Sequence, residues 1–169
     1  MEHKQILSLL VHNHPGVLIR IAGLFSRRGF NIDSLTVSET PDKEYSRMTI
    51  VVRGDDEVAE QVLYQVLKVA DVKVARLLPE QEAVLSELML VKVHALAAER
   101  SAIHKIAFTY HATVVDIGQT SMTIQATGHP SELDALAEHL QKQGILELVR
   151  TGLTALEAGD PCLVDRIED

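Results

Sequence analysis

The chain has 169 residues, of which 46% are hydrophobic and 4% aromatic, and its formal net charge at pH 7 is −8. This length provides for one ordinary domain or for two small ones. The negative charge and the absence of tryptophan argue against a nucleic-acid partner, because such proteins usually present a basic face and aromatic side chains for stacking on bases.

Three features bear on location. No apolar run approaches the roughly 20 residues that span a bilayer, so we expect no membrane segment. The opening residues "MEHKQI" do not begin the long apolar stretch of a signal peptide, so we expect none. Cys162 is the single cysteine, which excludes an internal disulfide and fits a reducing compartment. We therefore expect a cytoplasmic protein.

The first half of the chain predicts the order strand, helix, strand, strand, helix, strand. Apolar residues at helical spacing follow Pro15, which suits the first turn of a helix, and Gly29 has the place of a residue that ends one. Asp55, after Gly54, can cap the second helix. The predicted strands are 4–11, 30–39, 46–53 and 72–77, and the predicted helices are 17–28 and 58–67.

The second half repeats this order although its residues differ. The predicted strands are 88–95, 112–118, 121–128 and 145–152, and the predicted helices are 99–111 and 131–144. This is the split βαβ, or ferredoxin-like, order. We therefore predict an α+β chain with two ferredoxin-like βαββαβ domains in tandem. The predicted boundaries are a first domain at 1–78, a linker at 79–87, a second domain at 88–155 and an acidic C-terminal tail at 156–169.

The segment "NHPG", residues 13–16, separates the first strand from the first helix. In one interpretation, Pro15 and Gly16 only form the turn. In the other, the free N–H groups and positive dipole end of the helix hold a carboxylate, and Gly16 lets the ligand approach the backbone. Asn13 can serve a carboxylate or an ammonium group, and Asn31 could join it from the next strand. Such a site suits a small zwitterion, for example a free amino acid.

Other site chemistries find little support. His12 and His14, and likewise His104 and His111, lack further ligands at the spacing of a metal motif, so we expect no metal. The chain has no G-x-S-x-G, no G-x-G-x-x-G and no P-loop. The sequence therefore indicates no catalytic set.

Long segments resemble a known family. They are "ILSLLVHNHPGVLIRIAGLFSRRGFNIDSLTVSET" and "SRMTIVVRGDDEVAEQVLYQVLKVADV" in the first half, with "ELMLVKV" (87–93) and "ELVRTG" (147–152) in the second. They are similar to the regulatory (small) subunit of acetohydroxyacid synthase, also called acetolactate synthase. Ser86 departs from the arginine or similar residue that the family usually has there.

The resemblance implies that the first domain is an ACT domain, that two copies pair as a homodimer, and that an amino-acid effector, typically valine, binds at their seam. It implies no cofactor on this chain and a large catalytic partner subunit that carries thiamine diphosphate, magnesium and FAD. This chain is expected to activate that partner and to confer feedback inhibition in branched-chain amino acid biosynthesis. The implied effector contacts are Asn13, His14, Pro15, Gly16, Val17, Asn31, and, from the paired copy, Val37 and Ser38.

Three alternatives share the predicted fold. An RNA-binding module of this order needs aromatic residues on its third strand, but "SRMTIVVR" has none. An acylphosphatase-like enzyme needs an arginine in the loop after its first strand, where this chain has "HNHPG". An ACT-type amino-acid sensor that regulates a different enzyme stays open, as does the choice among valine, leucine and isoleucine. The second domain has "HALAAERSA" at the matching turn, without asparagine or glycine, so we expect it not to bind effector.

Overall fold

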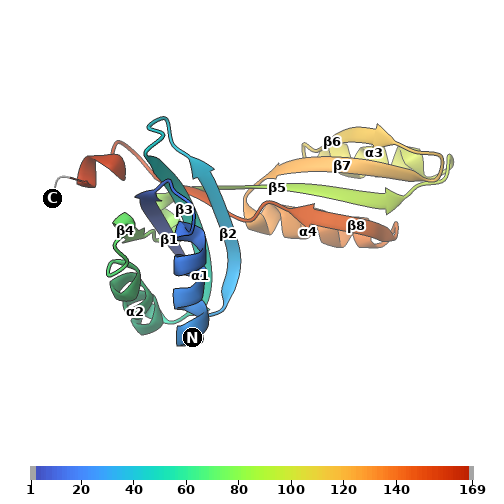
Figure 1. Ribbon diagram of the computed structural model, residues 1–169. Helices are drawn as coiled ribbons and strands as arrows, with labels where there is room; N and C mark the ends of the chain where they lie inside the picture. Colours follow the sequence, from blue (N-terminus) through green and yellow to red (C-terminus); the bar gives the residue numbers. More distant parts are fainter. Residues whose placement is uncertain (1–2, 168–169) are drawn as a thin grey trace. The chain divides into compact units, whose positions relative to one another are not determined.

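The structure, a computed structural model, describes residues 3–167. The chain divides into two compact units. The first unit consists of residues up to 84 together with residues from 153 onward, and the second unit consists of residues 85–152. Each unit combines an antiparallel sheet with two α-helices, as the predicted α+β ferredoxin-like fold requires (Figure 1).

The first unit has a four-stranded antiparallel sheet in the order β2-β3-β1-β4, with α1 and α2 on one of its faces (Figure 1). This order puts β2 and β4 at the two edges. The elements are β1 (His3–His12), α1 (Val17–Arg28), β2 (Ile32–Glu39), β3 (Tyr45–Gly54), α2 (Asp56–Val66), β4 (Val72–Leu77), η1 (Glu80–Glu82), β9 (Thr154–Glu157) and η2 (Val164–Arg166).

The ends of the two helices are set by the residues that the sequence singled out. Gly16 precedes α1 with a φ of 93°, and Gly29 follows it with a φ of 73°; both lie in the left-handed region that favours glycine. Asp55 caps α2, where its carboxylate accepts a hydrogen bond of 2.9 Å from the backbone N–H of Val58. The predicted cap and the predicted helix end are confirmed.

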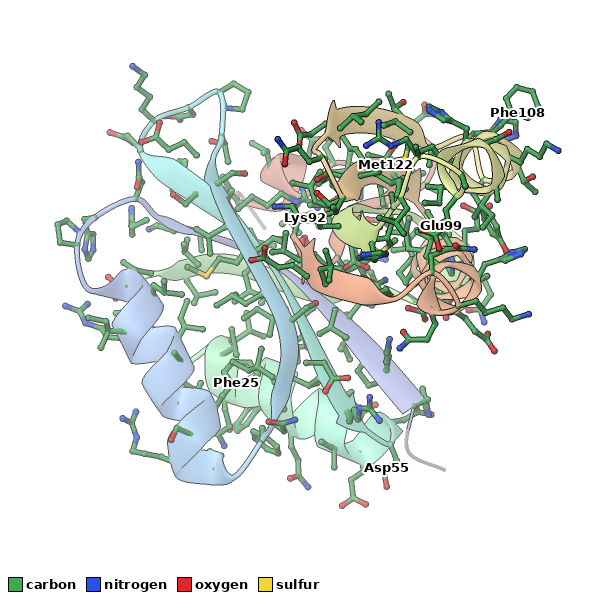
Figure 2. The ribbon with its side chains drawn as sticks, turned by 90° about the vertical axis from the view of Figure 1, so that its right-hand side faces the viewer. Phe25, Asp55, Lys92, Glu99, Phe108 and Met122 are labelled. Carbon is green, nitrogen blue, oxygen red and sulfur yellow. The ribbon has the colours of Figure 1, made fainter. Side chains whose placement is uncertain are left out.

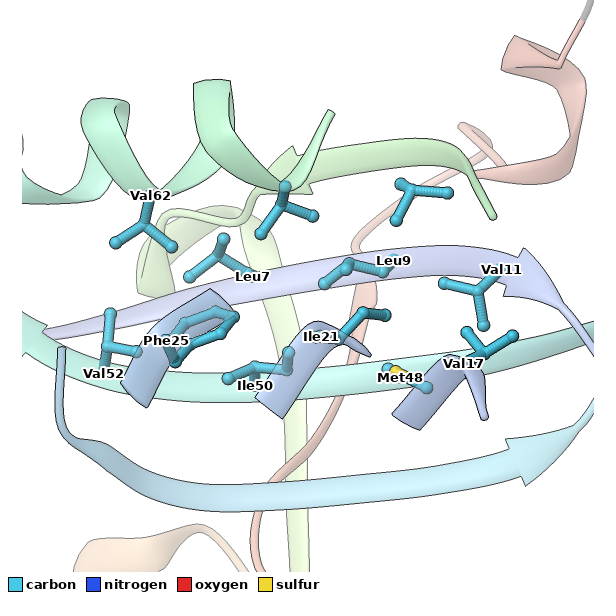
Figure 3. Close-up of a cluster of buried hydrophobic side chains, with 12 residues drawn as sticks. Leu7, Leu9, Val11, Val17, Ile21, Phe25, Met48, Ile50, Val52 and Val62 are labelled. Atoms are coloured by element: carbon cyan, nitrogen blue, oxygen red, sulfur yellow. The ribbon is translucent and has the colours of Figure 1, made fainter. Parts of the chain in front are cut away.

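The core of the first unit lies between the helices and the sheet (Figure 3). Alternate residues of β1 point into it, as the period of two in a strand requires. α1 contributes residues one helical turn apart, which share one side of the helix. The buried side chains from these two elements are Leu7, Leu9, Val11, Val17, Ile21 and Phe25.

The opposite face of this sheet is covered by the C-terminal segment, residues 153–167. Leu163 is buried against Leu10 and Val74. Arg76 forms an ion pair with Glu157 at 3.1 Å. This segment differs from the expected tail beyond 155, because its short strand β9 pairs with β5 and its apolar residues complete a core. A four-residue strand is too short to show a pattern in sequence.

The second unit has the sheet order β6-β7-β5-β8, with α3 and α4 on one face. Met122 lies in its core, whereas Phe108 projects from the outer side of α3 and is 82% exposed (Figure 2). The elements are β5 (Ala83–His94), α3 (Arg100–Thr109), β6 (Thr113–Ile117), β7 (Ser121–Gly128), α4 (Pro130–Gln141) and β8 (Ile145–Arg150). No helix within residues 3–167 is long and apolar enough to span a membrane.

Most element boundaries differ from the sequence expectation by one to three residues, and the starts of β5 and α4 have a clear physical reason. β5 begins at Ala83, inside the expected linker, because its first residues run beside β9; the backbone N–H of Ala158 donates to the carbonyl of Glu82 at 2.8 Å. α4 begins at Pro130, one residue before Ser131, and His129 is its N-cap. Proline suits this first helical position because its missing N–H has no partner within the helix.

Candidate functional site

The turn between β1 and α1 leaves the N-terminus of the helix open. Gly16 is the N-cap, no described side chain caps the helix by a hydrogen bond, and its first turn holds no acidic residue. The first N–H groups of a helix lack partners within it, and the helix dipole is positive at this end. This end of α1 can therefore bind an anion such as a carboxylate.

Gly16 keeps space clear at this position. A β-carbon built there has no described atom within 4 Å outside the immediate backbone neighbours. The glycine is therefore required by its left-handed backbone and not by crowding. A ligand can approach the backbone from the side where a larger residue would carry its side chain.

Asn13 is fixed by the β2–β3 hairpin. Its side-chain nitrogen Nδ2 donates to Oε1 of Glu39 at 3.2 Å and to the carbonyl of Lys43 at 3.0 Å. Its backbone N–H donates to the carbonyl of Glu44 at 2.7 Å. The amide of Asn13 is thus held at the mouth of the turn, beside the carboxylate that ends β2.

His14 and α1 are tied to the start of β4 by Asp71. Nε2 of His14 donates to the Asp71 carboxylate at 2.9 Å, and the guanidinium of Arg20 pairs with its other oxygen. Burial disfavours the charge on Asp71, but the hydrogen bonds and positive charges of Arg20 and His14 outweigh this effect and hold the pKa of Asp71 below its ordinary value. The backbone after the turn is therefore anchored by a charged, nearly buried carboxylate.

Val37 and Ser38 point to opposite faces of the sheet. Val37 is paired with Met48, a core residue on the face that α1 covers. Ser38 is paired with Arg47, whose guanidinium donates to the carbonyl of Ala155 in the C-terminal segment. Within one chain, Val37 therefore lies on the side of the open turn, whereas Ser38 lies on the other side.

Asn31 lies at the other end of α1 from Asn13. The helix between them has 12 residues, which corresponds to about 18 Å at 1.5 Å per residue. One chain therefore brings together Asn13, His14, Pro15, Gly16, Val17 and Val37, but not Asn31.

Comparison with known proteins decides the family. The model of the AHAS small subunit-like ACT domain matches residues 7–74, and the model of the small subunit of acetolactate synthase matches residues 86–159. The chain belongs to the acetolactate synthase small-subunit family. The first unit is accordingly an ACT domain, and a small subunit implies a large catalytic subunit as partner.

Curated relatives and a crystal structure agree with this assignment. The chain is 45% identical over 155 residues to the probable acetolactate synthase small subunit of Methanothermobacter thermautotrophicus, covering 91% of this chain and 92% of the relative. It is 40% identical over 158 residues to the small subunit of Haemophilus influenzae, covering 93% and 97%. The crystal structure of the Thermotoga maritima small subunit matches with a TM-score of 0.86 at 33% identity, covering 94% of this chain and 99% of that one.

The second unit of this small subunit differs at the matching helix terminus. The carboxylate of Glu99 accepts a hydrogen bond of 2.8 Å from the backbone N–H of Leu96 and lies 3.6 Å from Nδ1 of His94. Figure 2 labels Glu99 in this unit. The N-cap of α3 is therefore a glutamate with a right-handed backbone, whose carboxylate bonds to the preceding turn, whereas α1 has a left-handed glycine there; no described side chain caps either helix by a hydrogen bond.

Two residues of the site were absent from the sequence expectation, namely Glu39 and Asp71. The period of two in a strand puts Glu39 on the same face as Val37, so its position on β2 was a usable signal. Asp71 offered no signal, because its partners are more than fifty residues away in sequence. Among residues 3–167, no group of three or more histidine, cysteine or acidic side chains is placed to hold a metal ion.

Proposed function

We propose that this chain is the regulatory subunit of acetolactate synthase, that it activates the large catalytic subunit, and that it confers feedback inhibition by valine. Family membership and the ACT domain support a regulatory role. The observation that carries the effector site is the uncapped N-terminus of α1 at Gly16, with the polar side chain of Asn13 beside it. An amino acid offers its carboxylate to the helix N-terminus and its other polar group to the side chain of Asn13.

The proposed effector site is completed by a second copy of the chain. β2 is an edge strand, and an exposed edge offers unpaired N–H and C=O groups to another strand. If two β2 strands pair in antiparallel fashion, the start of one strand lies beside the end of the other. Asn31 of the second copy then comes close to Asn13, which one chain alone does not achieve.

The flank of α1 beside β2 supports such pairing. Arg20 and Arg28 contact Asp71 and Gln65, so they define the flank of α1 that faces α2. Leu18 lies on the opposite flank by helical geometry and is 43% exposed, as is Val37 on β2. Exposed apolar side chains beside an open strand edge are typical of an interface.

Catalysis in this proposal belongs to the partner subunit. The large subunit is expected to carry thiamine diphosphate, magnesium and FAD and to condense pyruvate with pyruvate or 2-oxobutyrate in the cytoplasm. This chain contributes the effector site and the coupling between sites, which is the requirement for allosteric control.

One reconstitution tests the proposal. The large subunit is assayed for acetolactate formation alone, with this chain, and with this chain plus valine, leucine or isoleucine. We expect the chain to raise the activity and valine to lower it again. Sedimentation of the chain alone should show at least a dimer. Binding of this chain to the large subunit without any change in activity would contradict the proposal, and so would a monomer of 18.6 kDa at micromolar concentration. Regulation of a different enzyme would then be the better explanation.

A further inference from the structure

The orientation of the Asn13 amide determines which part of an amino acid it can meet. Both neighbours of Nδ2, the carbonyl of Lys43 and the carboxylate of Glu39, are acceptors. A carbonyl or an ionised carboxylate cannot donate, so the NH₂ group must face them and both of its donors are used. Only Oδ1, an acceptor, is left for a ligand, and no described residue donates to it.

The open turn therefore has two poles of opposite character. The terminus of α1 at Gly16 offers backbone donors and positive potential. Three residues before Gly16, Oδ1 of Asn13 offers an acceptor. The carboxylate of Glu39, which is hydrogen-bonded to the same amide, offers further acceptors and a negative charge. A free amino acid carries the matching groups, because its α-carboxylate is an acceptor and its α-ammonium group is a donor of three hydrogen bonds.

Glu39 also lies on the correct face of its strand. It ends β2 and is separated by one residue from Val37, so both side chains are on the face that α1 covers. Val37 has partly exposed apolar surface there, which suits an aliphatic side chain. The aliphatic wall and the carboxylate thus come from the same stretch of strand, beside Asn13.

From this arrangement we infer that Glu39 binds the α-ammonium group of the amino-acid effector, together with Oδ1 of Asn13. The inference rests on the effector site proposed above and adds a basis for its specificity. Glu39 makes the site select amino acids over the corresponding deaminated acids, because only the amino acid neutralises its charge. A ligand that lacks the ammonium group would leave two negative charges facing each other.

Calorimetry on the full-length chain with two probes, valine and isovalerate, tests this role. Isovalerate has the carbon skeleton and carboxylate of valine without the amino group. For Glu39→Gln we expect valine affinity to fall by about tenfold or more, the range for a lost charge-assisted hydrogen bond. Isovalerate affinity should stay the same or rise, so the preference for valine over isovalerate should collapse.

The control is Glu44→Gln, which removes the same charge from the same hairpin. Glu44 contacts Asn13 only through its backbone carbonyl, so the preference should be unchanged. Glutamine at 39 retains an acceptor for Nδ2 of Asn13, which keeps the turn in place. Equal loss of both probes in Glu39→Gln, or an unchanged preference, would overturn the inference and leave the effector site standing. Failure of the wild-type chain to bind valine, leucine or isoleucine would overturn both.

Discussion

Glu87 and Arg150 form an ion pair in the second unit, with Oε2 of Glu87 2.6 Å from Nη2 of Arg150. Glu87 is almost buried, and Arg150 also pairs with Asp134 of α4. The two residues come from the motif segments "ELMLVKV" and "ELVRTG", which resemble the family in sequence. Glu87 and Arg150, with Asp134, therefore link β5, β8 and α4.

Arg150→Met should destabilise the second unit by about 3 kcal/mol, because it leaves the buried carboxylate of Glu87 without its partner. The measurement is the free energy of unfolding in urea. The double variant with Glu87→Gln should recover part of the loss, since no unpaired charge is then buried. Lys142→Met, at an exposed position of the same unit, is the control and should change stability little. If Arg150→Met and Lys142→Met lowered the free energy of unfolding equally, the ion pair would contribute nothing specific.

Leu163→Ala should cost about 2–3 kcal/mol of stability, as is typical when a buried leucine is truncated and leaves a cavity. The reason is that Leu163 fills the space between Leu10 and Val74 on the outer face of the first sheet. Val164→Ala is the matched control, because Val164 is the next residue and its side chain is 54% exposed. Thermal or urea unfolding measures both variants. A loss no greater than that of the control would show that the C-terminal segment does not cover this face in solution.

The sequence predicted most elements but fewer of the contacts between them. The helix ends at Gly29 and Asp55 could be predicted because their signals are local. The pairing of Asn13 with Glu39 joins residues 26 positions apart, and that of Glu87 with Arg150 joins residues 63 positions apart. Such contacts follow from sheet register, which a single sequence does not contain. The return of Leu163 to the first unit was unpredictable for the same reason.

Asp71 should make the stability of the first unit depend on pH in the acid range. The pKa of Asp71 is lowered in the folded chain: burial opposes the charge, but Arg20 and His14 favour it more strongly. A carboxyl group whose folded pKa lies below its unfolded value of about 3.9 stabilises the fold above that value. This contribution is lost as the pH falls through the folded pKa.

The measurement compares the wild-type chain with Asp71→Asn in urea between pH 7 and pH 3. The wild type should be more stable at pH 7, and the difference should shrink below about pH 4. Glu60→Gln, an exposed acidic residue of α2, should show a smaller dependence. A constant difference across the range would mean that the charge of Asp71 is not what stabilises the fold.

Gly16→Asp should abolish the response to valine while the chain still folds. The added carboxylate would occupy the open space at the N-terminus of α1 and would repel the carboxylate of the ligand. Gly16→Ala is the control, because it carries the strain of a left-handed backbone, about 1–2 kcal/mol, without the charge. Calorimetry with valine should therefore separate the two variants. Unchanged binding by Gly16→Asp would remove this turn from the effector site.

The two-unit division predicts separate roles in effector binding and inhibition. The first unit has the open turn with Asn13 and Gly16, whereas the matching turn of the second unit, "HALAAERSA", has neither asparagine nor glycine. However, residues 1–84 alone lack the C-terminal segment, so Leu10 and Val74 would lose the cover of Leu163. A better test joins residue 84 to residue 153 through a short Gly/Ser linker, because β9 runs beside the start of β5.

We expect this joined chain to be more stable than residues 1–84 and to bind valine as the full chain does. It should inhibit the large subunit in response to valine less strongly than the full chain, because coupling needs both the effector site and the contacts that transmit it. The matched control is the joined chain with Gly16→Asp, which should fold and not bind valine. A folded joined chain that fails to bind valine, or valine binding by residues 85–152 alone, would overturn this division between the units.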